Sequence, residues 1–448
     1  MMRTPIVDFV RSYAQKNGVR LHMPGHKGKS FIGCEELDIT EISGADVLYS
    51  PSGIVDESEN NASELFGSAH TFYSTEGSTL AIKAMLAIVT VLRGKDKPLI
   101  LAARNAHKAF VYAAALLDLD VEWIYSEKAE HLCSCVITPA GLEKALSKLD
   151  KKPSAVYLTS PDYLGNVLDI KGLSEVCHKN GVPLLVDNAH GAYFAFLKKN
   201  EHPIALGADM CCDSAHKTLP VLTGGAYLHI SKNANPKYLK IAREKLALFA
   251  STSPSYLILQ SLDMANSYIE DGYREKLAVL TDRLERTKRT LRANGYEVSD
   301  TEPLKIVLDL SKSDITGTEL AQLLRENNIE IEFCDKDYAV MMLTPENSES
   351  DILYLEEVLR SVKLCAAEAK ELNSPVSIAP ARRAMSIREA IFSESESVHI
   401  SIAEGRICAS PTVSCPPAVP IAVAGERINN SHVSAFKYYG IEYVLVVK

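Results

Sequence analysis

The sequence predicts an α/β fold, in which a mostly parallel β-sheet with helices on both faces is followed by a smaller α/β domain. The first observation is that short apolar strands and helical segments alternate between residues 98 and 230. The second is that polar, turn-forming segments follow several of these strands, where a parallel sheet presents its carboxyl edge. The third is a change of pattern beyond residue 256, where a long helical stretch leads into a shorter set of strands and helices.

Apolar periodicity defines the elements of the larger part. A short amphipathic helix is predicted from Pro5 to about Lys16, and a strongly apolar helix from Leu80 to Leu92. The alternating segments that follow are the strands 98–102, 121–125, 155–159, 183–187, 208–212 and 225–230, and the helices 106–117, 139–149 and 172–180.

The second half of the chain is predicted to hold the smaller domain and a tail. A single long helix is expected from Tyr256 to about Leu291, after a helix over 236–249. The smaller domain then comprises the strands 305–310, 329–333 and 339–343 and the helices 318–326 and 351–364. We therefore expect four parts: an N-terminal segment 1–75, a large domain 76–255, a linking helix with the small domain 256–370, and a C-terminal subdomain 371–448.

Composition limits the class of protein. The chain has 448 residues, of which 46% are hydrophobic and 23% charged, as in an ordinary soluble protein of two or three domains. A net charge of -9 disfavours nucleic acid or an anionic membrane as partner and does not repel a cationic substrate. No stretch approaches the roughly 20 apolar residues of a membrane span, and the N-terminal segment lacks the apolar core of a signal peptide. We expect a cytoplasmic protein.

The cysteines do not indicate a metal site. The chain has ten cysteines, and none of them form paired CxxC motifs. Cys133-x-Cys135 and the adjacent Cys211 and Cys212 do not have the spacing of a zinc set. We expect reduced thiols and no bound metal.

Two strand ends carry the residues that indicate chemistry. The apolar strand 183–187 ends in Asp187, and the strand 208–212 leads into Ser214-Ala-His216-Lys217. A lysine amine can form a Schiff base with an aldehyde cofactor, an acid can keep a pyridine nitrogen protonated, and serine and histidine can bind a phosphate. The pattern therefore predicts a pyridoxal phosphate site at Lys217. Taken alone, Ser-x-His-Lys also fits a solvated surface lysine, and the strand that ends in Asp187 is what favours the cofactor.

Three further segments are candidates for the same edge of the sheet. Gly77-Ser78-Thr79 precedes the apolar helix, where it forms either a phosphate cradle or a plain helix cap. His107 lies between a strand and a helix, in the segment 104–108. The segment 21–28, LHMPGHKG, is an irregular loop that either faces a ligand or is a simple turn.

Taken together, eight segments resemble the ornithine/lysine/arginine decarboxylase family of fold type I, aspartate aminotransferase-like, pyridoxal phosphate enzymes. They occur in the order of the family and span nearly the whole chain. They are LHMPGHKG (21–28), GADVLYSPSG (44–53), FGSAHTFYSTEGST (66–79), ARNAHKA (103–109), TSPDYLG (159–165), DNAHGAYF (187–194), SAHKTLPVLTGGAYLH (214–229) and CPPAVPIAVAGE (415–426).

The resemblance implies a role for each candidate. Lys217 would bind the cofactor covalently, and Asp187 would pair with its pyridine nitrogen. His107 would stack on the ring and Ala189 would pack on the opposite face, while Lys108 would support the loop. The other implied cofactor-binding residues are Ser78, Thr79, Ser214 and His216 at the phosphate, and His190 in the motif after Asp187.

The chain also departs from the family pattern. Asp162 stands where the family usually has threonine, Cys415 where it has tyrosine, and Ala424-Gly425 where it has Pro-Gly. These departures leave the substrate open. Because only 20 residues precede LHMPGHKG, we expect no N-terminal wing domain. The resemblance also implies a homodimer or higher homo-oligomer with the site at the subunit interface, which the loop 21–28 is a candidate to reach.

The implied activity is decarboxylation of lysine, arginine or ornithine to a diamine or polyamine precursor and CO2. A buried substrate cation needs a paired acid, and Asp162 and Glu426 are the candidates. For Asp162, substrate binding and an ordinary solvated loop acid are equally compatible with the sequence. Because one scaffold hosts many reactions, an aminotransferase, a β/γ-eliminating lyase and an inactive cofactor-binding regulator remain alternatives.

Overall fold

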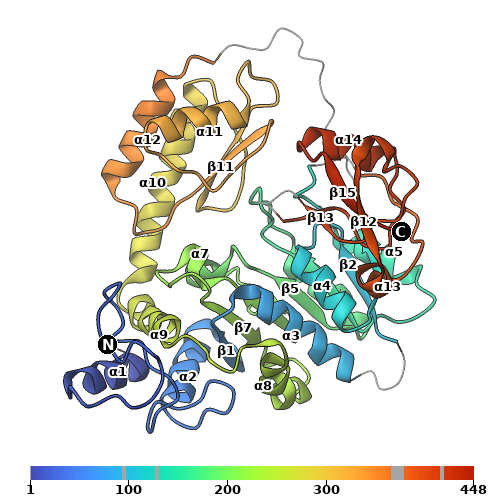
Figure 1. Cartoon of the computed structure of the whole chain (residues 1–448). Coiled ribbons are helices and arrows are strands. Elements are labelled where there is room, and N and C mark those ends of the chain that lie inside the picture. The colour runs from blue at the N-terminus through green and yellow to red at the C-terminus, as the bar shows by residue number, and fades with distance from the viewer. Residues whose placement is uncertain (1, 93–96, 127–130, 365–377, 414–417) are drawn as a thin grey trace. The chain divides into compact units, whose positions relative to one another are not determined.

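The computed structural model describes residues 2–92, 97–126, 131–364, 378–413 and 418–448 (Figure 1). The chain forms two compact units. Unit 1 comprises Met1–Asp96, Lys152–Leu158 and Ile170–Glu275, and unit 2 comprises Lys97–Lys151, Thr159–Asp169 and Lys276–Lys448. Among the described residues, every helix is too short or too polar to cross a membrane.

A seven-stranded sheet carries the alternating segments that the sequence predicts. Its strand order is β1-β7-β6-β5-β4-β2-β3. β2 pairs with β3 and β5 pairs with β6 in parallel, whereas β7 is antiparallel to both β1 and β6. The predicted mostly parallel α/β sheet is therefore confirmed. The strands are β1 (His70–Ser74), β2 (Leu99–Ala103), β3 (Asp120–Ile124), β4 (Ala155–Thr159), β5 (Leu184–Asp187), β6 (Met210–Asp213) and β7 (Ala226–Ile230).

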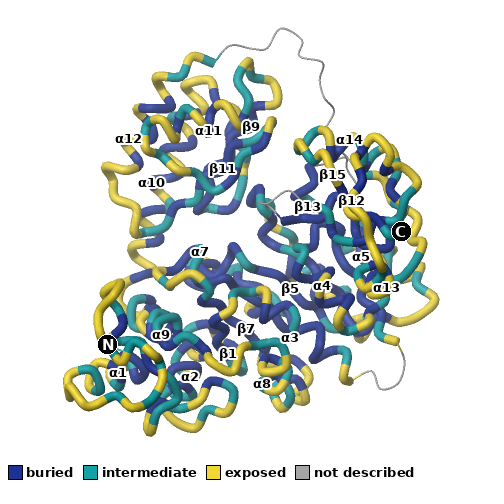
Figure 2. The backbone as a smooth tube through the Cα atoms, in the orientation of Figure 1, coloured by how far each residue is buried: buried dark blue, intermediate teal, exposed yellow. Residues whose placement is uncertain are grey.

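Helices pack on the strands of unit 1, as Figure 1 shows around β1 and β7. The apolar helix α3 (Gly77–Val91) contacts β1, β6, β7 and α8 (Lys237–Phe249), and α2 (Ile54–Phe66) contacts β1. Every residue of β5, β6 and β7 is buried, as Figure 2 shows for β5 and β7. Apolar burial therefore fixes the strands that carry Asp187 and precede Lys217. The other helices of this unit are α1 (Pro5–Gln15), α6 (Ile170–Lys179), α7 (Ala215–Thr218) and α9 (Tyr256–Glu270).

Unit 2 contains the predicted small α/β domain. A four-stranded antiparallel sheet has the order β10-β11-β9-β8. The helices α11 and α12 begin with complete capping boxes, at Thr316 and Ser348 respectively, which satisfy backbone N–H groups of their first turns. The elements are β8 (Glu297–Val298), β9 (Lys305–Asp309), β10 (Phe333–Cys334), β11 (Tyr338–Met342), α10 (Tyr273–Ala293, which begins in unit 1), α11 (Gly317–Glu326) and α12 (Glu349–Ser361). The helices α4 (Lys108–Leu116) and α5 (Pro139–Ser147) also belong to unit 2.

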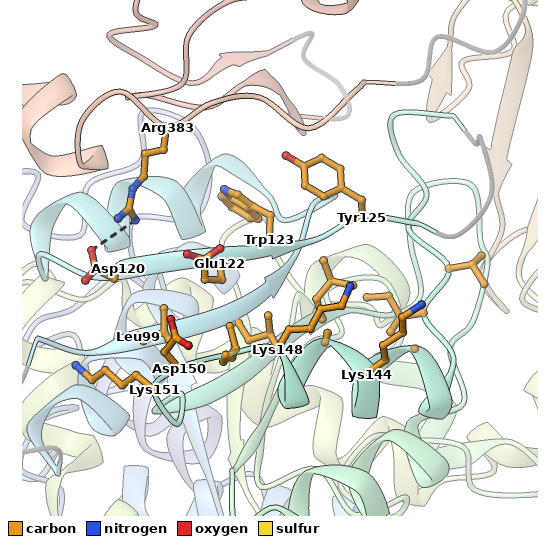
Figure 3. Close-up of a pocket in the computed structure, with 17 residues that line it drawn as sticks. Leu99, Asp120, Glu122, Trp123, Tyr125, Lys144, Lys148, Asp150, Lys151 and Arg383 are labelled. Atoms are coloured by element: carbon orange, nitrogen blue, oxygen red, sulfur yellow. Dashed lines mark ion pairs between the residues drawn. The ribbon is translucent and has the colours of Figure 1, made fainter.

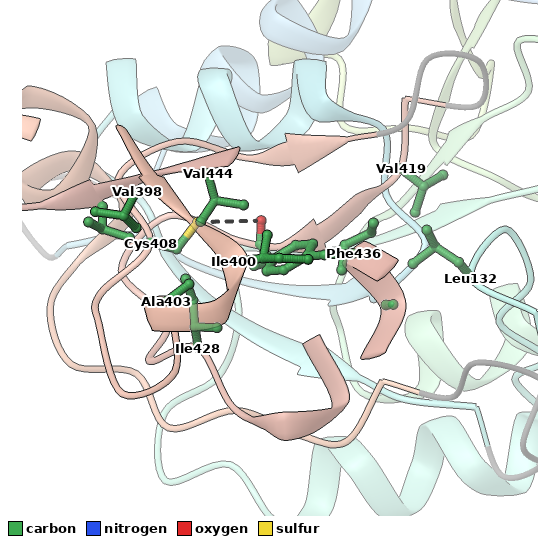
Figure 4. Packing of buried hydrophobic residues seen from close by; sticks show 13 residues of the cluster. Leu132, Val398, Ile400, Ala403, Cys408, Val419, Ile428, Phe436 and Val444 are labelled. Atoms are coloured by element: carbon green, nitrogen blue, oxygen red, sulfur yellow. Dashed lines mark hydrogen bonds between the residues drawn. The ribbon is translucent and has the colours of Figure 1, made fainter. Parts of the chain in front are cut away.

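The C-terminal part of unit 2 has its own apolar core. Figure 4 shows Cys408, Ile428, Phe436 and Val444 among the residues of this cluster. Two short antiparallel pairs, β12 with β15 and β13 with β14, frame it. The elements are α13 (Ile387–Phe392), β12 (Ser395–His399), β13 (Thr412–Val413), β14 (Pro420–Ala422), α14 (Asn430–Tyr438) and β15 (Tyr443–Val447).

Two predicted elements of the second half are wrong. The long helix expected over 256–291 is two helices, α9 and α10, because Gly272 between them adopts a left-handed φ of 77° that a continuous helix does not allow. The strand expected over 329–333 is reduced to the two residues of β10. Ile329 and Ile331 are only half-buried and Glu330 is exposed, so apolar burial does not support a longer strand here.

Candidate active site

Asp187 is buried at the end of β5, with 3% of its surface exposed. Its Oδ2 accepts a hydrogen bond from the Tyr157 hydroxyl at 3.0 Å. Its Oδ1 accepts from the Cys212 thiol at 3.6 Å and from the backbone N–H of Ala189 at 3.3 Å. Burial, reinforced by the neighbouring Asp187 carboxylate, raises the pKa of Tyr157 and of Cys212 well above their usual values. Both groups therefore stay protonated and serve as neutral donors to the carboxylate.

Lys217 lies on α7, a single helical turn that directly follows β6. Its backbone N–H donates to the carbonyl of Ser214 at 3.0 Å, and its Nζ lies 2.8 Å from Nε2 of His190. In the same turn, Nδ1 of His216 donates to the carbonyl of Gly225 at 2.9 Å, which fixes the orientation of the ring. Because β5 and β6 are parallel neighbours, Asp187 and the turn of Lys217 lie at adjacent carboxyl ends.

A second group of polar residues gathers at the N-terminus of α3. The Ser214 hydroxyl donates to the Ser78 hydroxyl at 2.9 Å, which joins the start of this 15-residue helix to the turn of Lys217. The N-cap residue Glu76 makes no side-chain capping bond to the helix. The free backbone N–H groups of the first turn and the two hydroxyls would be suitable donors to an anion, whereas Thr79 is exposed.

His107 belongs to unit 2 and caps α4. Its Nδ1 accepts a hydrogen bond from the backbone N–H of Ala109 at 3.1 Å, so the imidazole is held in place by its own helix. The predicted stacking of His107 on the cofactor ring stays a prediction.

Asp162 and Glu426 are both buried, with 3% and 4% of their surfaces exposed, so neither is a solvated loop acid. The Asp162 carboxylate accepts hydrogen bonds from the Ser134 hydroxyl at 2.8 Å and from the backbone and side-chain N–H groups of Asn166 at 3.0 and 2.8 Å. Burial raises the pKa of Asp162. Glu426 Oε2 accepts from the Arg104 guanidinium at 3.3 Å and from the backbone N–H of Val423 at 2.8 Å. Their binding of a substrate cation stays a prediction, and Cys415 lies outside the described residues.

A groove of about 660 Å³ lies elsewhere in unit 2, along the strands β2 and β3 and the helix α5 (Figure 3). Lys144 and Lys148 line it together with Trp123, and Arg383 forms an ion pair with Asp120 at 3.6 Å at one end. None of the predicted site residues lines this groove, so it is separate from the candidate site.

Comparison with known proteins decides the family. The model of the Orn/Lys/Arg decarboxylase major domain matches residues 4–307, and the model of the C-terminal domain of that family matches residues 368–442. The chain belongs to the Orn/Lys/Arg decarboxylase family. The resemblance seen in the sequence and the fold type I architecture are thereby confirmed, and the family depends on pyridoxal phosphate.

Individual relatives cover almost the whole chain. An arginine decarboxylase of Bacillus subtilis is 30% identical over 464 residues, which cover 96% of this chain and 92% of the relative. An arginine decarboxylase of Halalkalibacterium halodurans is 30% identical over 462 residues, with the same coverage of 96% and 92%. Among solved structures, a lysine decarboxylase of Francisella novicida superposes with a TM-score of 0.81 at 16% identity, covering 100% of this chain and 81% of the other.

The residues of unit 1 fit the family cofactor. Ser78, Ser214 and the start of α3 offer donors to a phosphate, and Asp187 offers a carboxylate to a protonated ring nitrogen. One buried polar atom next to Lys217 in sequence, Oγ1 of Thr218, finds no hydrogen-bond partner among the described residues. A polar ligand at this place is consistent with this unsatisfied hydroxyl.

Sequence reasoning missed the residues that surround Asp187. Tyr157 and Cys212 lie on the flanking strands β4 and β6, and their contact with Asp187 depends on the register of three strands. A polar residue in an otherwise apolar strand was the available signal: Tyr157 brings a hydroxyl into the buried segment AVYLT.

We expect borohydride reduction of the purified, cofactor-loaded protein, followed by peptide mapping, to place the pyridoxyl group on Lys217. Lys217 is at the strand end next to Asp187, where a covalent bond to the cofactor aldehyde would form. Lys217→Arg should lose the label, whereas the control Lys108→Arg, at the start of α4, should keep it. Label on another lysine in the wild-type protein would contradict the assignment.

Proposed function

We propose that the protein decarboxylates a basic amino acid, with arginine as the first substrate to test. Its family supports the reaction type, and the curated arginine decarboxylases that match it over 92% of their length support the substrate. The solved lysine decarboxylases, at 16–19% identity, support the fold alone. The observation that carries the proposal is the placement of Asp187 and Lys217 at adjacent ends of parallel strands.

Asp187 would keep a proton on the pyridine nitrogen of the cofactor. When bound, pyridoxal phosphate supplies an electron sink for the electron pair that remains when CO2 departs. A carboxylate that accepts hydrogen bonds from Tyr157, Cys212 and Ala189 is fixed in orientation before the substrate arrives. This preorganisation stabilises positive charge on the ring nitrogen without moving protein groups during the reaction.

Lys217 and His190 would transfer protons to and from the substrate. The 2.8 Å contact between Lys217 Nζ and His190 Nε2 allows a proton to pass between these two atoms. Lys217 would hold the cofactor covalently, and its amine would be placed to return a proton to the substrate. Ser78, Ser214 and the N-terminus of α3 would hold the phosphate and so anchor the other end of the cofactor.

The alternative reactions differ in what they need at the substrate carboxylate. An aminotransferase retains the carboxylate and holds it with a cationic clamp, whereas a decarboxylase gains from a weakly solvated carboxylate, because CO2 loss removes its charge. Family membership favours the decarboxylase. The presence of both Asp187 and Lys217 disfavours an inactive regulator.

We further propose that the protein works as a homodimer or larger homo-oligomer. Several apolar side chains in and around the LHMPGHKG loop are 77–90% exposed, an arrangement typical of a surface that another protein covers. These residues are Val19, Leu21, Phe31 and Ile32. The loop is therefore the segment that we expect at a subunit interface.

The first experiment mixes purified, cofactor-loaded protein with arginine, lysine and ornithine in turn, and measures CO2, the amine product and any keto acid. We expect CO2 and the corresponding amine in equal amounts from at least one of the three, and none from Lys217→Arg. A keto acid in place of CO2 would indicate transamination. Cofactor binding without any product would indicate a regulator and would contradict the proposal.

The second experiment tests the buried acids. If Asp162 or Glu426 pairs with the distal cation, then Asp162→Asn or Glu426→Gln should raise KM for the preferred basic amino acid about 10-fold or more, because a charged hydrogen bond is lost. The matched control substrate is norleucine, which has a comparable chain and no cation, and any residual reaction with it should be unaffected. If both variants leave every KM unchanged and only lower the unfolding temperature, the two acids are structural.

A further inference from the structure

Unit 1 contains a fully buried polar cluster that the proposed reaction does not use. Asp213 is the last residue of β6, and its Oδ2 accepts hydrogen bonds from Nε2 of His202 at 3.0 Å and from Nε2 of His229 at 3.1 Å. All three side chains are 0% exposed. A fully buried charged group is stable only with close partners, and the two histidines are the partners of Asp213 here.

The Nδ1 atoms of the two imidazoles, which do not bond to Asp213, have polar partners of their own. Nδ1 of His202 accepts from the backbone N–H of Ile204 at 3.4 Å, and Nδ1 of His229 lies 2.8 Å from the hydroxyl of Thr71. An accepting Nδ1 and a donating Nε2 define the neutral tautomer of His202. For His229, burial lowers the pKa and so favours the neutral ring. Although burial opposes ionisation, the two histidines hold the pKa of Asp213 well below its usual range. The cluster therefore carries one negative charge, on Asp213.

The second oxygen of Asp213 connects the cluster to the candidate active site. Nδ2 of Asn188 donates to Oδ1 of Asp213 at 2.7 Å. Asn188 lies between Asp187 and Ala189 in the chain, and its backbone N–H donates to the carbonyl of Cys212 at 2.9 Å. The backbone N–H of Ser214 donates to Ala189 at 3.3 Å. The hydrogen bonds between β5 and β6 thus continue into the segments that follow both strands. The bond from Asn188 attaches Asp213 to the segment after β5.

A metal centre is the competing explanation. Ligand atoms of His202, Cys211 and Asp213 lie within 4.8 Å of one another. However, both imidazoles approach Asp213 at hydrogen-bond distances and have partners at their Nδ1 atoms. Burial also raises the pKa of Cys211 well above its usual value, which favours the thiol over the thiolate that binds metals. Hydrogen bonding therefore accounts for the cluster without an ion.

We propose that Asp213 is a positioning residue for the cofactor: it holds Asn188 and thereby keeps the Asp187–Ala189 segment aligned with the turn that carries Lys217. The inference rests on the cofactor assignment at Asp187 and Lys217. It extends that assignment to a residue that contacts neither the cofactor nor the substrate.

The test compares two variants with a matched control. Asp213→Asn removes the charge, and Asn188→Ala removes the amide that links it to the site. The control Glu59→Gln removes another fully buried carboxylate of unit 1, which pairs with Arg243 at 2.5 Å and with His70 at 3.1 Å. For each protein, the cofactor Kd is measured by titrating the apoprotein with pyridoxal phosphate, together with the unfolding temperature of the apoprotein, kcat and KM.

We expect Asp213→Asn and Asn188→Ala each to weaken cofactor binding about 10-fold or more and to lower kcat, with little change in KM for the amino acid. The double variant should bind the cofactor no more weakly than the worse single variant, because the two residues act as one unit. Glu59→Gln should lower the unfolding temperature of the apoprotein without a comparable change in cofactor Kd.

Three outcomes would overturn the inference. If Asp213→Asn and Asn188→Ala both bind the cofactor as tightly as the wild-type protein, Asp213 does not position the cofactor site. If the cofactor affinity of all three variants falls in proportion to their loss of stability, the cause is general destabilisation. A stoichiometric metal ion in the wild-type protein that Asp213→Asn lacks would establish a metal centre. If the wild-type protein itself binds no cofactor at Lys217, the proposed function is wrong. This result is distinguishable from the three outcomes above, in which the wild-type protein binds the cofactor.

Discussion

The placement of one buried carboxylate, Asp187, is the constraint on which the site depends. A carboxylate in the interior needs donors, and the structure supplies three of them from β4, from β6 and from its own loop. Because two of these donors are side chains of flanking strands, the sheet must be in register for the acid to be satisfied. The same parallel pairing brings the turn of Lys217 beside Asp187. The stability of the fold and the proposed cofactor site thus depend on the same strand end.

The polar contacts around this strand end form two layers. The upper layer consists of groups that would meet the cofactor, namely Asp187, Lys217 with His190, and the hydroxyls at the start of α3. The lower layer is the Asp213 cluster, which is buried in unit 1 and reaches the upper layer through Asn188. Hydrogen bonds between buried groups such as these rigidify the elements that they join. Rigid positioning of charged groups is what electrostatic stabilisation of a transition state requires.

Local sequence patterns predicted the sheet, the strand ends and the candidate positions of Asp187 and Lys217, because strand periodicity and turn chemistry act over a few residues. Features that depend on distant partners were missed. The burial of Glu426 involves Arg104, which lies 322 residues away in the chain, and no local pattern reports such a contact. The shortness of β10 depends on how far Ile329 and Ile331 are buried in the folded chain, and the donors of Asp187 depend on strand register. The break at Gly272 was visible as a glycine, but an apolar helical pattern on both sides of it concealed the turn.

The most direct test of the central claim observes the proton that Asp187 is proposed to hold. Pyridoxal phosphate labelled with ¹⁵N in the ring can be bound to the wild-type protein and to Asp187→Asn, and the nitrogen resonance recorded by NMR near pH 7. The account predicts a protonated pyridine nitrogen in the wild-type protein and in Tyr157→Phe, which retains the carboxylate, and a neutral nitrogen in Asp187→Asn. A neutral nitrogen in the wild-type protein, or a protonated nitrogen in Asp187→Asn, would contradict it.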